Sequence, residues 1–173
     1  ITAYAANTAG TITGLANEAL SLSGNTSVAN QVTLDGKTTG IITATITEGD
    51  LATLASLADA NSNNALTVTV TDTSVAAAAL NTLNGKTTVA VNAAAITTLT
   101  GSLSDVQTAY TANDNSTISG LGNEAVTLSD TGSVVATLIT TLAGDTSGAV
   151  TVNNGVTTLT GTMAQVQAVY DAT

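Results

Sequence analysis

Residues 65–84, ALTVTVTDTSVAAAALNTLN, contain the unit from which the chain is built. Val68 and Val70 alternate with threonines, which is typical of a strand that has one buried and one exposed face. We therefore expect both valines to face a core and the threonines between them to face solvent. A polar corner at Asp72 follows, and the Ala-rich segment after it predicts a short helix that Asp72 caps.

The composition excludes several classes of function. The formal net charge is −10, because only Lys37 and Lys86 oppose twelve acidic residues. Such a surface repels phosphate groups, so we expect no nucleic-acid partner and no binding to anionic lipid. No apolar run approaches the roughly 20 residues that span a bilayer, so we expect no membrane insertion. The chain has no cysteine, which excludes disulfides and thiolate sites.

Internal matches indicate that the chain consists of repeats. The longest match pairs two segments that contain Gly-Leu-x-Asn-Glu-Ala, and a second pairs two segments that end in tyrosine. The matched pairs are ITGLANEALSL at 12–22 with ISGLGNEAVTL at 118–128, AYAAN at 3–7 with AYTAN at 109–113, TTLTGSLSDVQTAY at 97–110 with TTLTGTMAQVQAVY at 157–170, and DGKTT at 35–39 with NGKTT at 84–88.

The repeats predict an α/β repeat fold, a parallel β/α solenoid of about six coils with roughly 24–31 residues each. Strands would form one or two of its faces, and short Ala-rich helices would form another. Helices pack no closer than roughly 8 Å whereas paired strands lie about 4.8 Å apart, so we expect the solenoid to be curved or superhelical. Residues 1–173 would form a single solenoid segment. The expected equivalent residues of its coils are Leu22, Ile46, Val70, Leu99, Leu128 and Leu159.

Each coil is expected to hold strands and one helix. Period-two alternation predicts strands at 19–23, 43–47, 67–71, 97–100, 125–129 and 156–160. Shorter extended pieces are expected before them, at 11–15, 40–42, 65–66, 89–91, 117–121 and 149–152. The helical spacing of apolar residues predicts helices near 26–34, 51–57, 75–83, 103–110, 134–142 and 163–170.

Both ends of the sequence resemble the interior of a repeat. The opening ITAYAAN is similar to the end of the helix expected before residue 113, and the closing VYDAT reaches the same point of another repeat. A free-standing solenoid normally has polar capping units, and neither end resembles one. We therefore expect a slice of a longer array, or a protomer that stacks on copies of itself. The expected partners are neighbouring repeats or further copies, bound through the open ends.

Two motifs that suggest catalysis fit structural roles better. Gly-Lys-Thr-Thr at 36–39 and 85–88 is similar to the end of a phosphate-binding loop, but Gln31 and Leu80 replace the earlier glycine that such a loop requires. Glu18 and Glu124 lack the histidine, cysteine or partner acid of a catalytic site, so we expect them in turns. We therefore expect no enzyme, no catalytic or cofactor-binding residues, and no cofactor.

Acidic residues recur where strands are expected to meet helices. Carboxylates in a column would suit Ca²⁺, which prefers six to eight oxygen ligands. Single carboxylates at these places would instead cap helices and complement their dipoles. Glycines replace the acid in other repeats, at Gly24, Gly101 and Gly161, so we expect capping, with Ca²⁺ as the alternative and no committed metal ligand. The acidic residues concerned are Glu48, Asp50, Asp72, Asp105 and Asp130.

Rows of threonine and three equivalent tyrosines complete the pattern. A flat Thr-x-Thr grid binds ice in some β-solenoids, but threonine is also a common outward residue of strands. The expected curvature disfavours a match to a lattice. Tyr4, Tyr110 and Tyr170 occupy equivalent helix ends, and we expect them to fill the core beside the following corner.

With AYTAN, ISGLGNEAVTLSD, TDTSVAAAALNTLNGKTT and TTLTGTMAQVQAVY in view, the chain resembles the long tandem-repeat regions of giant secreted or cell-surface proteins of cyanobacteria and other aquatic bacteria, often called adhesin-like or RTX-like. The resemblance covers essentially the whole chain. It implies an extracellular or cell-surface location, a structural or adhesive task, and Ca²⁺ in flanking modules. The glycine-rich nonapeptides of RTX blocks are absent from this sequence.

The function expected from these patterns is that of a non-enzymatic structural module that acts as a spacer, coat or fibre-forming element. The alternative is an adhesin module that contacts a surface glycan or another cell. A Ca²⁺-stiffened stalk and an ice-binding threonine array are further alternatives.

Overall fold

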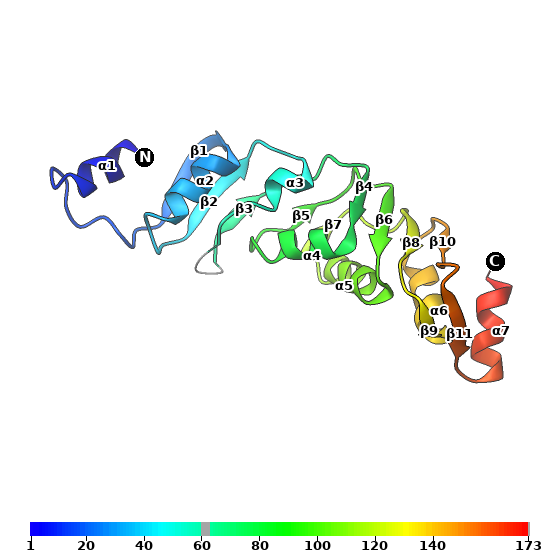
Figure 1. The fold of residues 1–173 in the computed structure, drawn as a ribbon. Coiled ribbons are helices and arrows are strands. Elements are labelled where there is room, and N and C mark those ends of the chain that lie inside the picture. Colours follow the sequence, from blue (N-terminus) through cyan, green and yellow to red (C-terminus); the bar gives the residue numbers. More distant parts are fainter. Residues whose placement is uncertain (60–62, 173) are drawn as a thin grey trace. The chain divides into compact units, whose positions relative to one another are not determined.

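The computed structural model describes residues 1–59 and 63–172 of the chain (Figure 1). Two compact units are present. Unit 1 consists of Ile1–Thr71 and Thr82–Asn92, and unit 2 consists of Asp72–Asn81 and Ala93–Thr173. Helix α4 (Ala77–Asn84) contributes its first residues to unit 2 and its last residues to unit 1.

Unit 1 is built on a parallel three-stranded sheet with the order β1-β2-β3. The register pairs Leu20 with Ile42 and Thr45 with Thr67, and a bulge interrupts β1 between Ser21 and Asn25. The elements of this unit besides α4 are α1 (Thr2–Thr8), β1 (Leu20–Thr26), α2 (Val28–Asp35), β2 (Ile42–Ile46), α3 (Leu51–Leu54), β3 (Ala65–Thr67) and β5 (Val91–Asn92).

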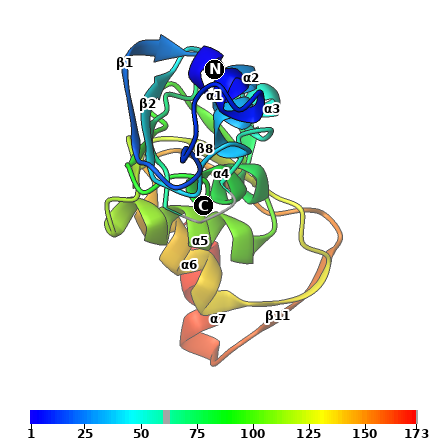
Figure 2. The same ribbon diagram turned by 90° about the vertical axis from the view of Figure 1, so that its left-hand side faces the viewer.

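Unit 2 contains a parallel four-stranded sheet with the order β10-β8-β6-β4 and a parallel pair of β11 with β9. Helix α6 contacts α5 on one side and α7 on the other, and Figure 2 shows the three helices following one another. The elements are β4 (Ser74–Ala76), β6 (Thr98–Gly101), α5 (Leu103–Asp114), β7 (Ile118–Ser119), β8 (Ala125–Leu128), β9 (Gly132–Val135), α6 (Ala136–Asp145), β10 (Val150–Thr151), β11 (Val156–Thr160) and α7 (Met163–Asp171).

The expected solenoid of six coils is wrong. The described residues form an α/β protein with several short parallel sheets of two to four strands and seven helices, rather than one ladder that continues through equivalent coils. The first sheet ends at β3, and the four-stranded sheet of unit 2 begins at β4, a segment expected to be helical. Because β4 and β9 are strands, helices α4 and α6 begin only at Ala77 and Ala136. Val75 and Val134 are β-branched, which favours the strand over the helix at these positions.

The six residues expected to be equivalent in the coils, from Leu22 to Leu159, do not pair with one another as expected. Leu99 pairs with Val75 and Val126 rather than with Val70 and Leu128. Ile46 pairs with Thr26 rather than with Leu22, and Leu159 pairs with Val134. The change from Leu128 to Val126 is a shift of two residues, which keeps the apolar side chains of a strand on the same face, so the alternating pattern does not specify the register there.

Most expected strands and helices are confirmed, as is the inward-outward alternation in the opening segment. Val68 and Val70 are buried, whereas Thr67, Thr69 and Thr71 are exposed. Residues 11–15, which were expected to be extended, form no strand. None of the helices within residues 1–59 and 63–172 has both the length and the apolar character needed to cross a bilayer.

Candidate functional site

Each copy of the Gly-Leu-x-Asn-Glu-Ala motif binds its glutamate to a tyrosine on the preceding helix. In unit 2 the Tyr110 hydroxyl of α5 donates a hydrogen bond to Glu124 Oε2 at 3.0 Å. In unit 1 the Tyr4 hydroxyl of α1 donates to Glu18 Oε1. We call each pair a tyrosine–glutamate clasp. The clasp is the strongest candidate site because it is polar, partly buried and present twice.

Backbone groups orient the two glutamates in the same way. The Gly122 N–H donates to Glu124 Oε2 at 2.9 Å, and the Ala16 N–H donates to Glu18 Oε2 at the same distance. A carboxylate that receives both a hydroxyl and a backbone N–H is fixed against its own turn. The turn therefore folds back on the helix end that carries the tyrosine.

An asparagine three residues after each tyrosine secures the same turn. Asn113 Oδ1 accepts from the Leu121 N–H at 3.1 Å, and Asn7 Oδ1 accepts from the Leu15 N–H at 3.2 Å. Residues three apart share one face of a helix, so tyrosine and asparagine reach the turn together. This geometry explains why Ala-Tyr-x-Ala-Asn and Gly-Leu-x-Asn-Glu-Ala recur at a constant separation.

A threonine and a glycine from the next repeat close the clasp from the other side. The Thr146 hydroxyl donates to the Glu124 carbonyl at 2.7 Å and accepts from the Gly148 N–H at 3.0 Å. The Thr38 hydroxyl likewise donates to the Glu18 carbonyl at 2.6 Å and accepts from the Gly40 N–H at 3.0 Å. The Gly-Lys-Thr-Thr segment at 36–39 therefore joins two repeats.

The two clasps differ in burial. Glu124 is 0% exposed and Tyr110 is 3% exposed, whereas Glu18 is half-buried. Glu124 Oε1 has no hydrogen-bond partner among the described residues. Burial raises the pKa of the Tyr110 phenol, and the neighbouring Glu124 carboxylate adds to the rise. In the other clasp the hydrogen bond from Tyr4 lowers the pKa of Glu18. Tyr110 and Tyr4 therefore fill the core as expected, whereas Tyr170 is 64% exposed.

A second buried polar cluster in unit 1 was not expected from the sequence. Gln31 is fully buried, and its side-chain amide forms two hydrogen bonds with the backbone of Ala58, at 2.7 and 3.0 Å. Asn64 donates to Asp35 Oδ1 at 2.6 Å and accepts from the Ile42 N–H at 2.9 Å. Each of these contacts joins α2 or β2 to the segment before β3. The cluster therefore fixes one repeat to the next.

Most acidic residues at the corners bind helix N-termini. Glu48 accepts from the Val28 N–H at 3.0 Å, and Asp130 accepts from the Leu103 N–H at 2.7 Å, so each contacts the helix of the preceding repeat. Asp50 caps α3 through the Thr53 N–H at 2.8 Å. Asp105 binds the Ser102 hydroxyl at 2.7 Å in the first turn of α5. The capping prediction is confirmed for Asp50, whereas Glu48 and Asp130 bind the N-terminus of a helix in the preceding repeat and Ser102, rather than Asp105, is the N-cap of α5.

The prediction that Asp72 caps the following helix is wrong. Strand β4 lies between Asp72 and α4, so Asp72 does not occupy the N-cap of that helix. No group of three or more acidic side chains within residues 1–59 and 63–172 lies close enough together to hold a metal ion.

Asp145 has the opposite electrostatics to the capping acids, because it ends α6, where the helix dipole disfavours a negative charge. Burial raises its pKa above the usual 3.8, and repulsion by Asp114 adds to the rise. A carboxyl group with a raised folded-state pKa destabilises the fold as pH rises through that pKa.

We therefore expect Asp145→Asn to raise the melting temperature by about 1–3 °C at pH 7. The difference should vanish below the unfolded-state pKa, where both side chains are neutral. Thermal unfolding followed by circular dichroism at pH 7 and pH 3 measures this. Asp130→Asn is the matched control and should lower the melting temperature at pH 7, because Asp130 accepts from the N-terminus of α5. A lower melting temperature for Asp145→Asn at pH 7 would contradict the argument.

Comparison of the chain with known family descriptions, with curated proteins and with solved structures finds no match.

Proposed function

We propose that the chain is a non-enzymatic structural repeat module of an extracellular or cell-surface protein, which acts as a spacer, coat or fibre-forming element. The observation that carries the proposal is the duplicated clasp. Its tyrosine and asparagine bind the turn that follows their helix, and its threonine binds the glutamate carbonyl from the next repeat, so these hydrogen bonds connect segments that are neighbours in sequence. Side chains that a catalytic site would use are thus engaged in holding repeats together.

The extracellular location in this proposal rests on the resemblance of the repeats to secreted tandem-repeat regions. Parallel strand pairing between neighbouring repeats also supports a structural role, because backbone hydrogen bonds join β1 to β2, β2 to β3 and β6 to β8. The partners we propose are neighbouring repeats and further copies of this chain.

Association of the purified chain tests the proposal. We expect the weight-average mass to rise with protein concentration in light scattering, and electron microscopy to show chains joined into oligomers or fibres. Added salt should promote association, because a net charge of −10 makes copies repel each other at low ionic strength. A particle that stays monomeric over the whole concentration and salt range would overturn the fibre-forming and coat roles.

A further inference from the structure

Two segments of unit 2 pack against each other, and each of them has a matching sequence elsewhere in the chain. One half of this interface is β6 with α5, and the other half is the segment 118–128. Across it Leu99 pairs with Val126, and the Ala125 N–H donates to the Thr97 carbonyl at 2.9 Å. The clasp between Tyr110 and Glu124 completes the contact.

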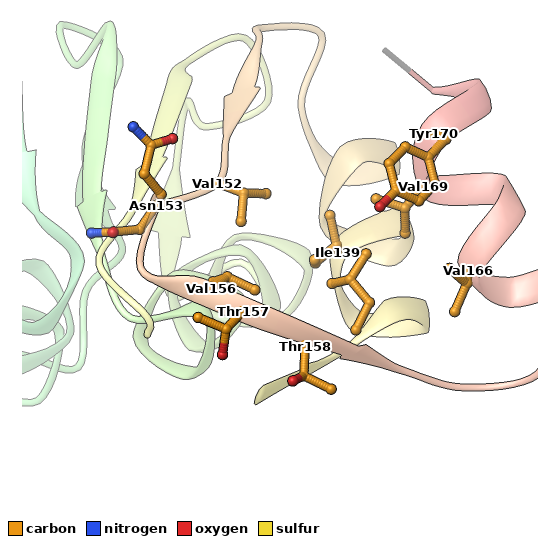
Figure 3. Close-up of a pocket in the computed structure, with 11 residues that line it drawn as sticks. Ile139, Val152, Asn153, Val156, Thr157, Thr158, Val166, Val169 and Tyr170 are labelled. Carbon is orange, nitrogen blue, oxygen red and sulfur yellow. The ribbon is translucent and has the colours of Figure 1, made fainter. Parts of the chain in front are cut away.

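The duplicate of the first half is β11 with α7, which has the sequence TTLTG followed by VQ and a tyrosine. Its apolar face is uncovered: Tyr170 is 64% exposed, whereas the equivalent Tyr110 is 3% exposed. A cavity of ≈ 560 Å³ opens beside this face. Figure 3 shows Val169 and Tyr170 on α7 near Ile139 of α6, with Val156 on the neighbouring strand.

The duplicate of the second half is the segment 12–22, and its first apolar residue is exposed. Ile12 is 42% exposed, whereas the equivalent Ile118 is 0% exposed. Strand β1 pairs with β2, and β11 pairs with β9. Each of these strands is the last in the order of its sheet, so each presents an edge that a further strand can extend.

We propose that β11 and α7 of one copy bind residues 12–22 of a second copy and so reproduce the internal interface of unit 2. The register follows from the duplicates: Leu159 pairs with Leu20 of the second copy, and Thr160 pairs with Ser21 of the second copy. Tyr170 donates its hydroxyl to Glu18 of the second copy. This inference rests on the proposed function and specifies the surface through which copies associate.

Helix α1 competes with this contact, because Tyr4 already occupies the position that Tyr170 would take beside Glu18. The competitor is weakly held. Helix α1 has seven residues, no side-chain N-cap hydrogen bond and only Tyr4 buried. Exchange of α1 for α7 of another copy therefore replaces one clasp by an equivalent clasp and adds the pairing of β11 with β1. Because the two surfaces are different, each copy can bind two others, and the contact propagates into a chain of copies.

Cysteine cross-linking tests the register, since the chain contains no cysteine of its own. Thr160→Cys protein is mixed with Ser21→Cys protein under mild oxidation. Paired strands lie about 4.8 Å apart, within the range of Cα separations that a disulfide bridges. We expect a disulfide-linked heterodimer on a non-reducing gel, confirmed by mass spectrometry of the linked peptides. Asn30→Cys, an exposed position on α2, is the matched control and should give no link to Thr160→Cys.

A second measurement does not depend on cysteines. Tyr4→Phe should raise the oligomeric fraction in light scattering several-fold, because it releases Glu18, and Tyr170→Phe should lower it. Oligomers that form without the 160–21 link, or that respond equally to both tyrosine variants, would overturn this inference and leave the proposed function standing. A chain that never associates would overturn this inference together with the fibre-forming and coat roles of the proposed function.

Discussion

Replacing Glu124 by alanine should lower the free energy of unfolding by about 3–4 kcal/mol. The Glu124 side chain is fully buried and accepts from the Tyr110 hydroxyl and from the Gly122 N–H. The alanine variant leaves both donors without an acceptor and creates a cavity in unit 2. Urea denaturation followed by far-ultraviolet circular dichroism measures the loss, and hydrogen exchange of the peptides around residues 118–128 assigns it to unit 2.

Glu18→Ala is the matched control, because Glu18 makes the same contacts but is half-buried. Water can satisfy the groups that this substitution releases, so its cost should be much smaller. Equal losses for Glu18→Ala and Glu124→Ala would contradict the view that burial sets the strength of the clasp. A double-mutant cycle of Tyr110→Phe with Glu124→Gln then isolates the coupling between the two side chains.

The sequence contains a signal for the clasp that the motif-by-motif predictions do not use. Tyrosine and glutamate are separated by 14 positions in both copies, Tyr4 with Glu18 and Tyr110 with Glu124. Two polar residues that recur at a fixed separation within matched segments are candidates for a direct contact. The glutamate motif taken alone predicts only a turn, and the partner of Glu18 and Glu124 follows only from the fixed separation to the tyrosine.

The sequence predicts some elements of the fold, whereas strands β4 and β9 and the buried polar cluster have no comparable signal. The helices α5 and α7 were predicted because their apolar residues follow the helical period over about two turns. By contrast, the apolar residues around β4 and β9 fit both the helical period and the period of a strand. These segments become strands because they pair with β6 and β11. The buried cluster of Gln31, Asp35 and Asn64 depends on register, which a period of two leaves free to shift by two residues.

Replacing Gly148 by alanine should destabilise unit 2 by at least about 3 kcal/mol, because a backbone must move to make room. A Cβ at this position would lie 2.2 Å from the Glu124 carbonyl oxygen and 2.7 Å from the Ala125 nitrogen. Shifting this backbone also disrupts the hydrogen bonds of the Thr146 hydroxyl. Thermal and urea unfolding of the variant measure the loss.

Gly144→Ala provides a control of opposite sign in the same unit. Gly144 lies within α6, and a Cβ there would meet nothing within 4 Å. Alanine is favoured over glycine inside a helix, so this variant should gain roughly 0.5–1 kcal/mol. If Gly144→Ala and Gly148→Ala had similar effects, the steric argument for Gly148 would be contradicted.

The need for glycine is specific to turns that contain a clasp glutamate. A Cβ added at Gly40 would lie 2.3 Å from the Glu18 carbonyl oxygen, which repeats the geometry at Gly148. A third turn of this type has Val89 at the same place, and there the Thr87 hydroxyl donates to the Leu66 carbonyl at 2.7 Å. Leu66 takes the place of the glutamate in that turn, and it has no carboxylate that binds the turn's own backbone. Gly40→Ala should therefore destabilise unit 1, and Val89→Ala should show no relief of strain.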